Sequence, residues 1–119
     1  MANNSFNCGL EAALAVIGGK WKPLVLFNLA QNVHRYGELK RAIGGVTDKV
    51  LIQQLKELER DEIIARVDFQ EIPPKVEYSL TPFGRSLATA LGGLCAWGTE
   101  HMRTVERISE RRTAALSQA

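Results

Sequence analysis

Two cysteines and two histidines are the side chains of this sequence best suited to metal or redox chemistry. Cys8 and Cys95 lie 87 positions apart, and neither has His34 or His101 close beside it. Structural zinc sites pair ligands a few residues apart, so this spacing predicts no metal site and no cofactor. Two isolated cysteines also do not form a disulfide framework, and we therefore expect a reduced, cytoplasmic compartment.

Cys8 stands directly before the first expected helix, over residues 10–17, and allows two interpretations. Free cysteines commonly behave as small buried apolar residues. Alternatively, the positive end of the helix and the nearby Lys20 or Lys22 favour a reactive thiolate. Cys8 would then be the more reactive of the two thiols, whereas Cys95 lies in an apolar stripe and is predicted to be core.

A polar face follows in the middle of the chain, on an amphipathic helix that begins at Thr47. Thr47 is a suitable N-cap, and the carboxylate of Asp48 is favourable near the positive end of a helix. Leu51, Leu55 and Leu58 repeat at intervals of four and three, which predicts one buried stripe. The opposite, exposed face consists of Asp48, Lys49, Ile52, Gln53 and Lys56.

This polar face carries groups that match the edges of bases, since Gln can bind adenine and Lys can bind guanine or phosphate. A charged helix face is often only solvated, so the position of this face in the fold has to show whether it binds DNA. A short helix over residues 37–43 and a turn at Gly44 and Gly45 precede the face, as in a helix-turn-helix. The alternative to a helix-turn-helix is an ordinary pair of packed helices. Weaker candidates, expected to contact phosphates, are Arg35, Lys40, Arg66 and Lys75.

Apolar and polar residues then alternate twice, with the period of half-buried strands. Pro73 and Pro74 lie between the two segments, and prolines donate no ladder hydrogen bond, so they belong at a hairpin tip beside Lys75. Thr81 is expected to cap a new helix with Pro82 at its first position. This is the element order of a winged helix with a basic tip. The predicted inward residues are Ala65, Val67 and Phe69, then Val76, Tyr78 and Leu80.

From Pro82 onward the sequence predicts helix, interrupted at Gly92 and Gly93. An apolar stripe continues along it at helical spacing, and a chain of 119 residues has little core left for that stripe to cover. A second copy of the chain is the expected cover. The stripe consists of Leu87, Leu91, Leu94, Gly98, Met102, Val105 and Ile108, with Trp97 beside it.

Composition is that of one globular domain, with 45% hydrophobic and 24% charged residues. The net charge of +2 does not by itself identify a nucleic-acid partner. The apolar run over residues 10–17 is too short to span a membrane and contains Glu11. No nucleophile elbow or phosphate-cradling loop indicates an enzyme.

Three motifs together resemble the HxlR-type branch of the MarR-like winged-helix transcription regulators. They are IGGKW, RYGELKRAIGGVTDKVLIQQLKELERDEII and PPKVEYSLTPFG, and the resemblance covers nearly the whole chain. It implies an α+β, mostly helical fold and a single winged helix-turn-helix domain over residues 1–119. The helix-turn-helix is expected at about 37–60, the wing at about 64–80 and C-terminal dimerisation helices at about 82–112.

The resemblance also implies a homodimer on an inverted-repeat DNA operator, with the helix from Thr47 in the major groove and the wing near Lys75 over the backbone or minor groove. It allows, without requiring, an oxidant sensor at Cys8 or a small-molecule effector between the subunits. The alternative is a winged-helix module that binds protein rather than DNA. The expected dimer interface, from the first and last helices, is Leu10, Leu14, Leu87, Leu91, Leu94, Trp97, Met102 and Val105.

The sequence departs from the family pattern at four positions. Gly9 follows Cys8 where Cys-Pro is usual, and Ile52 and Gln54 stand where Thr and Arg are common. The two helix changes weaken any transfer of base contacts from the family. Glu62 stands where a glycine is usual and places an acid in the turn before the wing.

Overall fold

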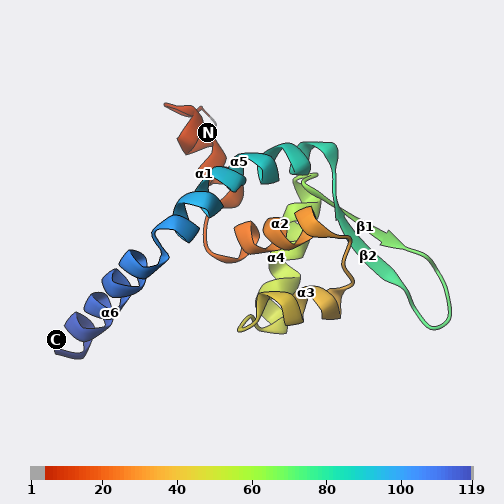
Figure 1. Cartoon of the computed structure of the whole chain (residues 1–119). Coiled ribbons are helices and arrows are strands. Elements are labelled where there is room, and N and C mark those ends of the chain that lie inside the picture. Colours follow the sequence, from red (N-terminus) through yellow and green to blue (C-terminus); the bar gives the residue numbers. More distant parts are fainter. Residues whose placement is uncertain (1–4, 119) are drawn as a thin grey trace. The chain divides into compact units, whose positions relative to one another are not determined.

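The structure is a computed structural model that describes residues 5–118. These residues form helices and one antiparallel hairpin (Figure 1). The predicted class, α+β and mostly helical, is confirmed. Two compact units divide the chain, the first ending at Ala88 and the second beginning at Thr89. The elements are α1 (Gly9–Ile17), α2 (Trp21–Gln31), α3 (Tyr36–Ile43), α4 (Asp48–Arg60), β1 (Ile64–Asp68), β2 (Val76–Leu80), α5 (Pro82–Glu100) and α6 (Met102–Gln118).

The core of the first unit forms around α2, which packs against α3, α4 and β2. The predicted stripe of α4, Leu51, Leu55 and Leu58, is buried, and α4 also contacts β1. Burial of each such side chain contributes roughly 1.5–3 kcal/mol, so this stripe fixes which face of α4 points outward. The other buried apolar residues include Val25, Leu26, Leu29, Leu39, Ile63 and Ile64.

Two threonines begin helices as predicted. The Thr47 hydroxyl accepts a hydrogen bond of 3.3 Å from the Val50 backbone N–H at the start of α4. The Thr81 hydroxyl accepts one of 3.0 Å from Gly84 at the start of α5. A side chain at Gly84 could not fit, because a Cβ there would lie 1.9 Å from the Ile63 carbonyl oxygen. The first turn of α5 is therefore packed against the backbone where β1 begins.

The hairpin is confirmed, with β1 and β2 paired from Ile64 opposite Leu80 to Asp68 opposite Val76. The prolines lie in the loop beyond these pairs. The predicted burial of Val67 and Phe69 is wrong, since these side chains are 44% and 42% exposed. The hairpin extends beyond α2, α3 and α4, as Figure 1 shows, and only its base reaches the core.

The connector before α3 also contacts the wing. His34 and Tyr78 form an isolated antiparallel bridge, with backbone hydrogen bonds of 3.1 Å and 2.7 Å. This bridge ties the start of the helix-turn-helix to β2. It also fixes the backbone of Tyr78.

The predicted interruption at Gly92 and Gly93 is wrong, because α5 continues through both to Glu100. A glycine inside a helix costs only about 1 kcal/mol relative to alanine, which does not end a helix whose hydrogen bonds continue on both sides. The break lies instead at His101, and α6 then extends beyond the predicted end near residue 112, to Gln118.

Candidate nucleic-acid interface

The turn between α3 and α4 is built on two glycines. Gly44 and Gly45 have φ values of 70° and 71°, in the left-handed region that favours glycine. The turn presents α4 with its leucine stripe inward and its polar face outward. The cap Thr47 and the residues predicted for that face are all exposed: Thr47, Asp48, Lys49, Ile52, Gln53 and Lys56.

Asp48 is held by α3. Its carboxylate oxygen Oδ1 accepts a hydrogen bond of 2.5 Å from the Tyr36 hydroxyl and lies 2.9 Å from Lys40 Nζ. The Tyr36 bond and then Lys40 hold the pKa of Asp48 below its usual value. Burial and the Asp48 bond raise the pKa of Tyr36 to about 12. Nothing in the sequence pattern indicated Tyr36, since its partner lies on another helix.

Gln53 also has a partner inside the chain. Its amide nitrogen Nε2 donates a hydrogen bond of 3.1 Å to Glu57, and Glu57 pairs with Lys22 of α2 at 2.8 Å. Lys22 and then Gln53 hold the pKa of Glu57 below its usual value. The charge of Lys22 is therefore compensated by Glu57, and Lys20 lies over the Trp21 ring at 4.6 Å. The two lysines that the sequence suggested as partners of Cys8 thus have other contacts.

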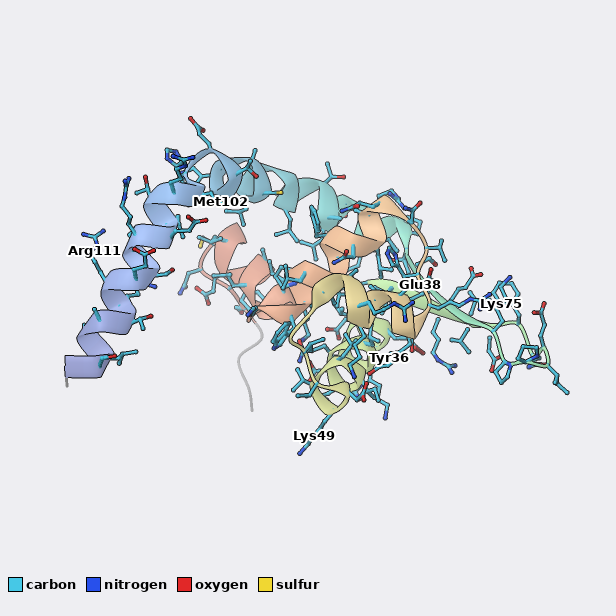
Figure 2. The ribbon with its side chains drawn as sticks, turned by 60° about the horizontal axis from the view of Figure 1, so that its bottom comes forward. Tyr36, Glu38, Lys49, Lys75, Met102 and Arg111 are labelled. Atoms are coloured by element: carbon cyan, nitrogen blue, oxygen red, sulfur yellow. The ribbon has the colours of Figure 1, made fainter. Side chains whose placement is uncertain are left out.

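Four of the predicted basic residues have side chains in no ion pair with any residue from 5 to 118. Figure 2 shows Lys49 at the start of α4, pointing away from the ribbon. Such unpaired cations can contact phosphates without first breaking an internal interaction. The four residues are Arg35, Lys49, Lys56 and Arg66.

The wing differs from the basic tip expected from the sequence. Lys75, labelled on the hairpin in Figure 2, lies 3.5 Å from the Glu77 carboxylate and 4.5 Å above the centre of the Phe69 ring. From Asp68 to Glu77 the hairpin holds one lysine and three acids, Asp68, Glu71 and Glu77, so its formal charge is 1 − 3 = −2. Lys75 is therefore compensated within the wing.

The second unit carries an open apolar groove of about 570 Å³. Leu94, Trp97 and Met102 line it and are 66%, 56% and 52% exposed. Contiguous exposed apolar side chains of this size mark a surface that another molecule covers. Cys95 is exposed as well, so its predicted burial is wrong within one chain. Of the other predicted interface residues, Leu10, Leu14 and Val105 are exposed, and Leu87 and Leu91 are half-buried.

Sequence comparison decides the family. The profile described as "HxlR-like helix-turn-helix" matches residues 16–106. The chain belongs to this family. It is 48% identical over 105 residues to the uncharacterized HTH-type transcriptional regulator YtcD of Bacillus subtilis (strain 168), covering 88% of this chain and 83% of YtcD.

Solved structures agree with that placement. The redox regulator HypR in its reduced form matches with a TM-score of 0.78 at 38% identity, over 84% of this chain and 99% of HypR. Diamide-treated YodB from B. subtilis matches with a TM-score of 0.66 at 31% identity, over 81% of this chain and 96% of YodB. The predicted winged helix-turn-helix fold and the transcription-regulator class are thus confirmed for this HxlR-like protein.

Cys8 of this HxlR-like protein is exposed at the N-cap of α1, so it is not buried within one chain, and its predicted position before the helix is confirmed. No cluster of His, Cys, Asp or Glu between residues 5 and 118 is arranged to hold a metal ion. Across the same residues, no helix combines the length and apolar character needed to cross a membrane.

Proposed function

We propose that this family member is a sequence-specific regulator that binds an inverted-repeat DNA operator as a homodimer. The observation that carries the proposal is the outer face of α4. The helix is capped by Thr47 and anchored by a buried leucine stripe, and its exposed face presents Lys49, Gln53 and Lys56. A helix of this kind, second in a helix-turn-helix, enters the major groove in proteins that bind DNA this way.

The residues of the face take different roles in this proposal. Gln53 contacts a base edge, where its amide can bind adenine through two hydrogen bonds. Lys49 and Lys56 contact guanine or phosphate, and Ile52 offers an apolar contact to a thymine methyl. Asp48 acts mainly by holding α4 to α3 through Tyr36. The proposed phosphate contacts are Arg35, Lys40, Arg66 and Lys75. Lys40 and Lys75 are paired with Asp48 and Glu77 within the chain, so their charges are partly compensated.

Dimerisation covers the groove of α5 and α6. Leu94, Trp97 and Met102 leave apolar surface in water, and burying it contributes about 25 cal/mol per Å². Leu10 and Leu14 of α1 add a second exposed apolar patch. Two subunits related by a two-fold axis place their α4 helices in successive major grooves, about 34 Å apart.

The deciding experiment is selection of bound duplexes from a random pool. We expect recovery of an inverted repeat with half-sites about one helical turn apart. Binding should weaken as salt rises, because phosphate contacts release counterions. Recovery of no preferred sequence, together with no salt-dependent affinity for duplex DNA, would favour the alternative of a winged-helix module that binds protein.

A redox response through Cys8 is a second part of the proposal. Its support is the exposed thiol at the start of α1, beside the apolar residues proposed for the dimer, and the similarity of the chain to the redox regulator HypR. Modification at that place would change how two subunits pack and so change operator affinity.

A further inference from the structure

A cavity of about 360 Å³ in the first unit lies between α4 and the wing. Three elements contribute to it. Ile52, Leu55, Lys56 and Glu59 come from α4, Arg66 comes from β1 and Tyr78 comes from β2.

The cavity brings two cations together without an internal partner. Lys56, Arg66 and the single acid Glu59 form no ion pair or side-chain hydrogen bond with any residue between 5 and 118. Their formal charges sum to 2 − 1 = +1. The Tyr78 phenol adds a hydroxyl donor, on a strand whose backbone His34 fixes. Two cations and a hydroxyl that line one cavity beside apolar side chains are groups of the kind that bind the oxygens of a phosphate.

We infer that this cavity is a phosphate site, and that a backbone phosphate of bound DNA occupies it. The inference rests on the proposed function and adds a specific contact to it. In a duplex, the sugar-phosphate backbone separates the major groove from the minor groove. If α4 lies in the major groove and the wing lies toward the minor groove, one strand must cross the junction of α4 and the wing. The cavity is at that junction.

A shared phosphate has a measurable signature. Each phosphate contact contributes about one to the slope of log affinity against log salt concentration. Lys56→Gln and Arg66→Gln should each weaken binding to operator and random duplexes alike. Because both side chains hold the same phosphate, the double variant should lose about one in slope, not two.

The matched control adds Lys49, which lies seven residues before Lys56 on the same helix, about 10 Å along its axis, and does not line the cavity. Adding Lys49→Gln to the double variant should lower the slope by about two in total, because it removes a separate phosphate contact. Glu59→Gln should raise affinity several-fold, because it removes a negative charge from the phosphate site. Melting curves of all variants confirm that they fold.

A second arm separates DNA from free phosphate as the source of the occupant. Inorganic phosphate is titrated into the free protein at constant ionic strength, and the amide NMR signals around Arg66 and Tyr78 are followed. Saturable shifts that are absent from the double variant, with competition against DNA, show that the site also takes free phosphate. A shared slope of about one without such shifts assigns it to the DNA backbone alone.

Two results would overturn the phosphate site and leave the proposed function intact. One is a loss of about two in slope by the Lys56 and Arg66 double variant, and the other is unchanged DNA affinity in both single variants. If the unaltered protein binds no duplex, the proposed function fails instead. The free-phosphate titration then decides about the cavity by itself, and an absence of saturable shifts overturns the site.

Discussion

The Tyr36 hydroxyl donates a hydrogen bond to the Asp48 carboxylate, and this contact joins the first residue of α3 to the first residue of α4. Lys40, one turn further along α3, approaches the same carboxylate oxygen. Two side chains of α3 thus hold the end of α4 that carries Lys49. The angle between the two helices depends on these contacts as well as on the turn at Gly44 and Gly45.

The first prediction concerns alkaline pH. The pKa of Tyr36 is raised to about 12 from an ordinary 10.0, by burial and by the bond to Asp48. The neutral phenol therefore favours the folded state, so its contribution is fully present below pH 10 and is lost as pH rises through about 12. Thermal unfolding of the wild type should show this alkaline loss, and Tyr36→Phe should show less of it.

Tyrosinate absorbance gives an independent check, because the chain has only two tyrosines. The component that titrates near pH 12 should vanish in Tyr36→Phe and persist in Tyr78→Phe. Persistence of that component in Tyr36→Phe would contradict the assignment.

The second prediction is that the protein is a dimer. Sedimentation at micromolar concentration should give about twice the chain mass of 13.2 kDa. Met102→Glu should produce monomers, because it places a charge in the apolar groove, and it should also abolish operator binding. Ala114→Glu is the control, since it adds the same charge to α6 at an exposed position outside the groove. A monomeric wild type, or equal effects of the two substitutions, would show that the groove is not the interface.

The third prediction separates base recognition from phosphate contact. Gln53→Ala should relax the preference at one or two base pairs and cost roughly 1–3 kcal/mol on the selected operator, with little effect on random DNA. Lys49→Ala should weaken binding to both and lower the salt slope by about one. Titrations of both duplexes at several salt concentrations measure the difference. Equal losses by the two variants on both duplexes would mean that the roles are wrongly assigned.

The fourth prediction concerns Glu62, which has a φ of 60° in the left-handed region. This conformation costs a residue with a Cβ about 1–2 kcal/mol and costs glycine almost nothing. Glu62→Gly should therefore raise the free energy of unfolding by about 1 kcal/mol. Glu59→Gly is the matched control, because it removes an exposed acid from within α4 and should lower stability by about 1 kcal/mol. Urea unfolding curves compare the two, and a loss of stability in both would show that Glu62 is not strained.

The fifth prediction concerns the two thiols, which are both exposed, so accessibility alone does not distinguish them. Cys8 lies at the N-cap of α1, whereas Cys95 lies inside α5 next to Leu94 and Trp97 of the groove that the proposed dimer covers. Cys8 should therefore react faster with an alkylating agent, as followed by mass spectrometry with Cys8→Ser and Cys95→Ser. Mild oxidation should change operator affinity in the wild type and in Cys95→Ser. A response that survives in Cys8→Ser would exclude Cys8 as the sensor.

Local features of the fold could be predicted from the sequence, because the residues that cause them are neighbours. Thr47 and Thr81 cap the helices that follow them, and the leucine stripe of α4 is determined by helical spacing alone. The break between α5 and α6 was misplaced because two glycines cost too little to end a helix. Val67 was expected inside because alternation shows that a strand has two faces, not how far the hairpin extends beyond the core.

The pairings of the site depend on contacts between distant segments, which no local pattern contains. Tyr36 meets Asp48, Lys22 meets Glu57, and the phosphate-site cavity combines α4 with both strands of the wing. The polar face of α4 could be predicted, since it follows from the leucines opposite it. Which of its side chains are free and which are already engaged could not be predicted.

The hydrogen bond from Gln53 to Glu57 would affect sequence discrimination in the proposed regulator. A glutamine that turns toward a base must give up this bond, and Glu57 then keeps only Lys22 as a partner. A matching adenine replaces the lost bond with two, whereas a mismatched base leaves the exchange incomplete. In the proposed complex, the bond to Glu57 would therefore compete with each base that Gln53 meets. On DNA without a matching base, Gln53 would keep this bond within α4.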